Sequence, residues 1–330
     1  MTQVVSTESS RREHRAILML LIACALWGVS FNWNKNAQAL LGERLVEHGG
    51  NATLHSSAPA AFLAVRFIGT VILWCIFFPR SLRGWTKRTA LVSTLGGALL
   101  AGGMLFQHYG LVDASESLMA FLTSLTVLFT PIIASLLLRH RVSGMMWVAV
   151  ACATVGVALM SLFRDEGRFD LGAAMGLVCA LIFSVHILVV DHFGKTEDVW
   201  RFSLGQFASA ALFIVLFALW RPGGSQLLDP HVAVSAFASW KLAFLLALTI
   251  VFSTIITFGI MFAYQPRTSP TRAALTYLSE PIFATLYAWM ATGTAITPAA
   301  MGGAGLIILG NVCAEVFARR GAAPPLATDE

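Results

Sequence analysis

Two side chains of opposite charge occur inside long apolar stretches of this sequence. Glu280 lies near the middle of segment 271–289, and Arg66 lies within segment 60–78. A charge at the centre of a bilayer costs about 3 kcal/mol on insertion scales, so each side chain must face a partner or a polar cavity rather than lipid. At about 1.5 Å of rise per residue, their depths differ by about one helical turn. They are candidates for an interhelical ion pair or for a substrate or proton site.

The residues around Glu280 predict a polar face on its helix. At 3.6 residues per turn, Tyr277 and Glu280 lie on one face, whereas Leu275 and Leu278 cover the rest. Pro281 has no backbone N–H and therefore leaves the Tyr277 carbonyl free to bind something else. We expect Tyr277 and Glu280 to contact a solute.

Other polar and aromatic residues have both a functional and a structural interpretation. Trp27 lies about 16 Å into segment 16–33, too deep for an interfacial belt, and forms either a cavity floor or part of the core. Gln107 makes either an interhelical hydrogen bond or a cavity contact. The hydroxyl of Thr257 faces the cavity or bonds back to its own helix. His186 is either a satisfied core histidine or a group that takes part in proton coupling.

The composition places the chain in a lipid bilayer. Its 57% apolar and 12% charged residues compare with about 45–50% and about 25% in soluble domains. The net charge of +5 is spread over short hydrophilic breaks, so a nucleic-acid partner is excluded. All five cysteines lie in apolar runs, and we expect no disulfide, metal site or cofactor.

Hydropathy predicts an all-α integral membrane protein with ten membrane-spanning helices. The first is an uncleaved span rather than a signal peptide, because the apolar run continues past the short stretch before Cys24. The connections 36–59 and 221–241 are predicted to be loops that need not be ordered. The segments are 16–33, 60–78, 90–111, 118–138, 145–163, 171–190, 202–220, 242–264, 271–289 and 299–317.

The distribution of basic residues predicts the orientation. With the N-terminus inside, 15 of the 22 Lys and Arg residues lie in cytoplasmic segments and six lie outside. Both termini are therefore expected in the cytoplasm, with the protein in a bacterial plasma membrane.

The chain divides into two halves of five segments, and the odd number inverts the second half in the membrane. We expect a cytoplasmic tail (1–15), a first repeat (16–163), an outer connection (164–170), a second repeat (171–317) and a cytoplasmic tail (318–330). Corresponding positions in the halves support this division, since Pro131 matches Pro281 and Gly156 matches Gly310.

Motifs along almost the whole chain resemble the drug/metabolite transporter superfamily, in particular its EamA-type members with two five-helix repeats. The resemblance implies a cavity lined by the third, fourth, eighth and ninth segments, which adds Thr123 to the predicted site. The motifs are Trp27-Gly28 with Phe31, Arg66-Phe67, Ala114-Ser115, Ala120-Phe121-Leu122-Thr123 with Pro131, Ser269-Pro270, Ala273-Ala274, Glu280-Pro281, and Gly302-Gly303 with Gly310.

The function expected from this resemblance is secondary active transport of small organic metabolites, amino-acid-like or related solutes, by alternating access. The partners are the lipid bilayer, the solute, and a coupled proton or counter-solute. The alternative is a membrane-embedded enzyme or a channel with a polar cavity. No G-x-S-x-G or His-Glu-x-x-His motif is present and the histidines are scattered, which argues against an enzyme.

Overall fold

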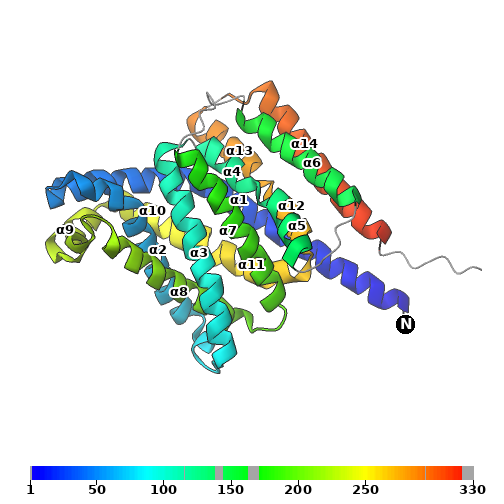
Figure 1. The fold of residues 1–330 in the computed structure, drawn as a ribbon, viewed down its shortest axis with the longest axis horizontal. Helices are drawn as coiled ribbons and strands as arrows, with labels where there is room; N and C mark the ends of the chain where they lie inside the picture. Colours follow the sequence, from blue (N-terminus) through cyan, green and yellow to red (C-terminus); the bar gives the residue numbers. More distant parts are fainter. Residues whose placement is uncertain (1, 115, 138–143, 163–170, 294, 322–330) are drawn as a thin grey trace, which may run out of the picture.

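The computed structural model describes residues 2–114, 116–137, 144–162, 171–293 and 295–321, and every regular element in these ranges is helical (Figure 1). The predicted connection 164–170 and the chain beyond residue 321 lie outside the described residues. Each of the ten predicted segments contains helix in its described part.

Seven predicted segments contain one uninterrupted helix. These are α1 (Thr2–Gly49), α2 (Ala58–Phe77), α3 (Lys87–Asp113), α6 (Gly144–Leu162), α7 (Leu171–Phe193), α8 (Val199–Trp220) and α14 (Pro298–Gly321).

The other three predicted segments are divided. Segment 118–138 contains α4 (Glu116–Ser124) and α5 (Thr126–Leu137), and segment 271–289 contains α12 (Pro270–Tyr277) and α13 (Glu280–Thr292). In segment 242–264 a π-helical turn, Val251–Ile256, joins α10 (Trp240–Ile250) to α11 (Thr257–Tyr264).

Six helices in the described residues are long and apolar enough to cross a membrane. The helical stretches are Arg11–Gly49, Ala52–Phe77, Lys87–Asp113, Leu171–Phe193, Val199–Trp220 and Trp240–Arg267. Large apolar side chains such as Ile72, Leu91 and Leu216 point outward from them, as expected for contact with lipid. The chain is thus an all-α membrane protein, and the number of crossings beyond these six stays a prediction.

The prediction of a loop at 36–59 is wrong. Helix α1 continues to Gly49, and a 3-10 helix, Ala52–Ser57, leads into α2. The extension is amphipathic, because Ala37, Leu41 and Leu45 recur every fourth residue and are fully buried. Its charged outer face lowers the average hydropathy, which makes the sequence look like a loop.

The loop prediction at 221–241 is also wrong, because this stretch contains a 3-10 helix, Gly224–Leu228, and α9 (Pro230–Phe237). The Asp229 side chain accepts a hydrogen bond from the His231 N–H and caps α9, with Pro230 at the first helical position. Arg44 of the α1 extension donates to the carbonyls of Ser235 and Ala236 at the other end of α9. The α1 extension and α9, both wrongly predicted as loops, therefore stabilise each other.

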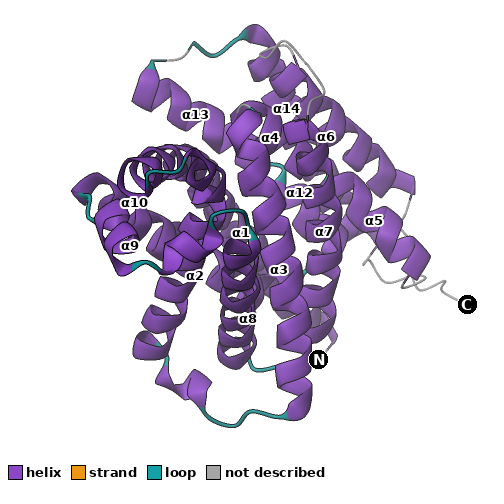
Figure 2. Cartoon of the chain, turned by 60° about the vertical axis from the view of Figure 1, so that its left-hand side comes forward, coloured by secondary structure: helices purple, strands orange, loops and turns teal. Residues whose placement is uncertain are grey.

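Close helix contacts are made at glycines, in the bundle seen in Figure 2. A Cβ on Gly28 of α1 would lie 2.7 Å from the Glu280 carbonyl oxygen, so α1 and α13 meet backbone to backbone. Helices α6 and α14 pack in the same way through Gly156 and Gly310. The backbone of α13 beside Glu280 is therefore fixed against α1.

Reporter fusions test the number of crossings. We expect a fusion after Arg141 and a fusion after Arg168 to report opposite sides of the membrane, because segment 145–163 lies between them. The readout is the activity of a periplasm-specific and a cytoplasm-specific reporter at each site. If only the six long helices cross, both fusions report the same side, and the ten-span prediction fails.

Candidate functional site

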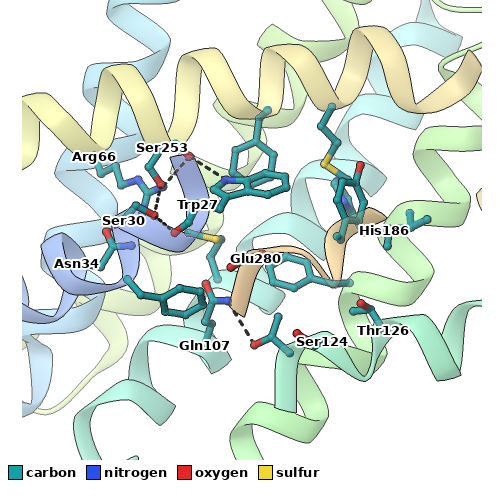
Figure 3. A pocket seen from close by; sticks show the side chains of 18 residues that line it. Trp27, Ser30, Asn34, Arg66, Gln107, Ser124, Thr126, His186, Ser253 and Glu280 are labelled. Carbon is teal, nitrogen blue, oxygen red and sulfur yellow. Dashed lines mark hydrogen bonds between the residues drawn. The ribbon is translucent and has the colours of Figure 1, made fainter. Parts of the chain in front are cut away.

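A cavity of about 80 Å³ lies among the central helices (Figure 3). Its walls come from α1, α2, α3, α4, α5, α7, α11, α12, α13 and the π turn. Six of the seven residues predicted to contact a solute line it, namely Trp27, Arg66, Gln107, Thr123, Tyr277 and Glu280. The structure thus gathers these residues in one place, and their role in binding stays a prediction.

Arg66 is enclosed by neutral hydrogen-bond acceptors. Its side chain is 1% exposed. Nε donates to Thr254 Oγ1 at 2.7 Å, Nη1 to Asn34 Oδ1 at 3.2 Å, and Nη2 to Ser253 Oγ at 2.9 Å. Nη2 also donates to the Ser253 carbonyl oxygen at 3.1 Å. The guanidinium fork is held in a fixed orientation, and none of the described residues provides a counterion for its positive charge.

The π turn of the eighth segment supplies two of the residues that hold Arg66. Extra residues in a π turn shift the side chains that follow around the helix axis, and such turns are frequent at functional sites. Here Ser253 and Thr254 both reach Arg66 from consecutive positions. The Ser253 carbonyl also accepts from Trp27 Nε1 at 3.2 Å and from Thr257 Oγ1 at 2.7 Å.

Glu280 stands at the break between α12 and α13. Leu278 N–H donates to the Leu275 carbonyl and Ser279 N–H to the Thr276 carbonyl, which tightens the last turn of α12. Helix α13 then begins with Glu280 and Pro281. A proline fits the first turn of a helix and an acidic residue is stabilised there, so this dipeptide starts a helix rather than kinking a continuous one. The predicted segment 271–289 is thus two helices, and the break lies directly before the proline that was expected to free the Tyr277 carbonyl.

Arg66 and Glu280 form no ion pair, which removes one of the two alternatives drawn from the sequence. Both line the cavity, but the donors of Arg66 are directed to α1 and the π turn. Within the described part of the chain, no hydrogen bond or ion pair holds the Glu280 carboxylate. The cavity therefore contains a fixed cation and a separate carboxylate.

Two of the predicted residues lie on the wall formed by α3 and α4. Gln107 Nε2 lies 3.5 Å from Thr123 Oγ1, and that hydroxyl donates to the Met119 carbonyl at 2.9 Å. Thr257 does not line the cavity. It is fully buried and its hydroxyl bonds back to Ser253, so the structural interpretation is correct for this residue.

Trp27 covers another side of the cavity, and two polar residues on its helix were missed. The indole packs edge-on against Phe258 and Tyr277, with ring centres 5.1 and 5.7 Å apart. Ser30 and Asn34 line the cavity beside it, and Ser253 Oγ donates to Ser30 Oγ at 2.8 Å. Their spacing of three and seven residues from Trp27 marks the same helix face and is the signal that identifies them.

His186 has both a cavity position and a structural partner. It is fully buried, and its Nε2 lies 2.8 Å from Gln206 Oε1 on α8. Its Nδ1 has no hydrogen-bond partner in the described part of the chain. The ring is thus oriented by α8, with one nitrogen left for a further contact.

Cysteine labelling tests the assignment of the cavity walls. In a cysteine-free background, Gln107→Cys and Thr123→Cys should react with a small water-soluble thiol reagent, because both positions line the cavity. Thr257→Cys and Leu275→Cys should react at least about tenfold more slowly, since these side chains are buried in the protein. Equal rates in the two pairs would show that the walls are wrongly assigned.

The hydrogen bonds of Arg66 predict that even a substitution that keeps its positive charge lowers the stability of the protein. Arg66→Lys keeps the charge, but an ammonium group cannot reach Asn34, Ser253 and Thr254 together. Thermal unfolding of purified protein should show a loss of about 1–3 kcal/mol from the stranded polar groups. Arg80→Lys, at an exposed position, is the control and should unfold like the parent. A parental melting temperature for Arg66→Lys would show that these bonds do not contribute.

Comparisons with known proteins agree with this description of the chain. The model of the EamA-like transporter family matches residues 170–314. An uncharacterized transporter from Archaeoglobus fulgidus is 25% identical over 298 residues, which cover 89% of this chain and 83% of the relative.

The fold is also found in a solved crystal structure. That protein superimposes with a TM-score of 0.67 at 17% identity and covers 94% of this chain and 100% of its own. The family match, the relative and the apolar helices all support the predicted resemblance to EamA-type members of the drug/metabolite transporter superfamily.

Proposed function

We propose that the protein is a secondary active transporter that moves small organic metabolites, amino-acid-like or related solutes, across the bacterial plasma membrane by alternating access. The observation that carries the proposal is the carboxylate of Glu280 at a helix break, inside a cavity that also contains the buried cation of Arg66. Burying two charges without pairing them is costly, so a site that maintains them is expected to use them.

The proposed architecture is ten crossings in two inverted repeats, 16–163 and 171–317, with both termini in the cytoplasm. Reciprocal packing supports it. Helix α7, at the start of the second repeat, packs against α3, α4 and α5 of the first. In the same way α1, at the start of the first repeat, packs against α11, α12 and α13 of the second. Each repeat thus places its first helix against the third to fourth segments of the other.

The broken helices support alternating access around one site. The fourth segment divides between Ser124 and Thr126, and the ninth divides between Tyr277 and Glu280. All four residues line the cavity. Many carriers have discontinuous helices at matching positions of their two repeats, and these breaks expose backbone groups to a solute at the membrane midplane. Rocking one repeat against the other would then open the cavity to each side in turn.

The chemistry of the walls supports an amino-acid-like solute. An ammonium group is complementary to Glu280, and a carboxylate is attracted to the uncompensated charge of Arg66. The remaining wall is largely apolar, with Trp27, Phe258 and Met261, and suits a hydrocarbon side chain. A volume of about 80 Å³, at about 10–15 Å³ per water-sized position, holds a solute of only a few heavy atoms.

Competition for Glu280 provides a physical means of coupling. A proton and a solute ammonium group neutralise the same carboxylate, so the two are not expected to occupy it together. If each stabilises a different arrangement of α12 and α13, binding shifts the equilibrium between the open sides. A proton or a second solute then drives transport through the same residue.

Replacement of Glu280 tests the proposal. Glu280→Gln retains the shape and removes the charge, so solute uptake by proteoliposomes should fall about ten- to a hundredfold. A hydrogen bond to a charged group contributes about 1.5–3 kcal/mol, and about 1.4 kcal/mol is a factor of ten. Folded yield should stay close to that of the parent. The matched control is Glu43→Gln on the exposed face of the α1 extension, which should transport normally.

A double substitution separates a solute site from a structural role. If the two charges mattered only to each other, Arg66→Met with Glu280→Gln would restore both stability and transport. Because they form no ion pair, we expect the double variant to transport no better than Glu280→Gln alone. Full transport by the double variant would show that Glu280 is not part of the solute site. Steady conductance or product formation in the same liposomes would instead support a channel or an enzyme.

A further inference from the structure

We propose that Gln265, together with the Glu13–Arg272 ion pair, forms a gate that closes the cavity toward the end of the bundle where α1 begins. The proposal rests on the proposed transport function and adds the residues that control access from one side. In the orientation proposed above, that side is the cytoplasm.

A second and larger hollow lies at this end of the bundle. We call it the N-side recess, and its volume is about 920 Å³. Charged side chains line it, including Arg15 of α1, Asp191 of α7, Lys195 and Arg267. A recess of this size with a charged lining holds water, so it extends the aqueous phase toward the central cavity.

Gln265 lies between the two hollows. It is fully buried, its Nε2 donates to the Ile187 carbonyl at 2.7 Å, and its Oε1 accepts from Tyr277 Oη at 2.9 Å. Both of its partners, Ile187 and Tyr277, line the central cavity. The recess is lined by Pro266, which follows Gln265, and by Asp191, which lies one helical turn after Ile187. The Gln265 side chain therefore joins α7 to α12. We call the layer of protein between the central cavity and the N-side recess the partition.

The ion pair closes the partition on its recess side. Glu13 Oε1 of α1 accepts from Arg272 Nη1 of α12 and from Thr268 Oγ1, the latter at 3.2 Å. The Glu13 side chain is 31% exposed and borders the recess, so water can solvate its carboxylate when the helices separate, whereas the Arg272 side chain is only 9% exposed. On the contact between α3 and α7, by contrast, a Cβ on Gly172 would lie 2.9 Å from the Gly110 carbonyl oxygen. That contact brings two backbones close together, whereas the Glu13–Arg272 contact joins two side chains at the edge of the recess.

Tyr277 links the gate to the solute site. Its ring lies against Trp27 in the cavity wall, its hydroxyl holds Gln265, and Glu280 follows directly after the break. A solute that draws Glu280 and Tyr277 into the cavity therefore removes one of the two hydrogen bonds of Gln265. Occupancy of the site and closure of the recess side are in this way set by the same residue.

One-sided labelling tests the gate. The full-length chain, without its native cysteines and with Thr123→Cys as the single thiol, is reconstituted in vesicles. A membrane-impermeant thiol reagent is then added from the side of the N-terminus or from the opposite side. Glu13→Gln and Gln265→Leu should each raise the labelling rate roughly tenfold from the N-terminal side only. The charge-swapped pair Glu13→Arg with Arg272→Glu should return the rate to the background value.

The controls separate gating from loosening of the fold. Lys195→Gln removes the 2.8 Å ion pair to Asp191 on the wall of the recess without touching the partition, and should label at the background rate. If Gln265→Leu does not fold, Gln265→Asn shortens the same side chain and takes its place. Background labelling in Glu13→Gln and in the Gln265 variant, equal increases from both sides, or no recovery in the swapped pair would overturn the gate.

The labelling readout does not depend on transport. One-sided increases in a protein that transports nothing would retain the gate and reject the proposed function. Transport with unchanged labelling would reject the gate alone.

Discussion

The central constraint on this structure is the burial of one guanidinium group in the interior of an apolar bundle. Arg66 is 1% exposed, and it is held without a carboxylate partner in the described part of the chain. Every donor that it directs into the protein must meet an acceptor, since an unsatisfied group there costs several kcal/mol. That requirement explains why α1 carries Asn34 on its inner face and why the eighth segment contains a π turn. Two of its acceptors, Asn34 and Ser253, also line the cavity, so this cation determines part of the polar wall.

The helix break before Glu280 follows from a second constraint, the backbone chemistry of proline. Pro281 cannot donate to Tyr277, and in an apolar environment an unsatisfied carbonyl is costly unless water or another donor reaches it. The chain resolves this by ending α12 at Tyr277 and starting α13 at Glu280. As a result, the carboxylate sits where the backbone is least regular. A cavity at this level is both the solution to the backbone problem and the place where a solute is most easily bound.

Much of the architecture could be predicted from sequence, and the failures have definite causes. Hydropathy located helix in all ten segments, and interruptions of hydropathy identified Arg66 and Glu280 as cavity residues. The α1 extension was missed because its buried stripe of Ala37, Leu41 and Leu45 is narrow and its other face is charged. Thr257 was placed in the cavity on the assumption of a regular helix, whereas a π turn precedes it. The partners of Arg66 depend on helix rotation and side-chain reach, which no periodicity encodes.

The length of α1 has a mechanical consequence. Its 48 residues extend roughly 70 Å at about 1.5 Å per residue, more than twice the thickness of a bilayer core of about 30 Å. One continuous helix therefore carries Glu13 near one end, Trp27 and Asn34 midway, and Arg44 toward the other. If α1 rotates as a rigid body about its close contact with α13 at Gly28, its two ends move in opposite directions. In the proposed transport cycle, separation of the helices at one end of the bundle would then be accompanied by closer packing at the other end.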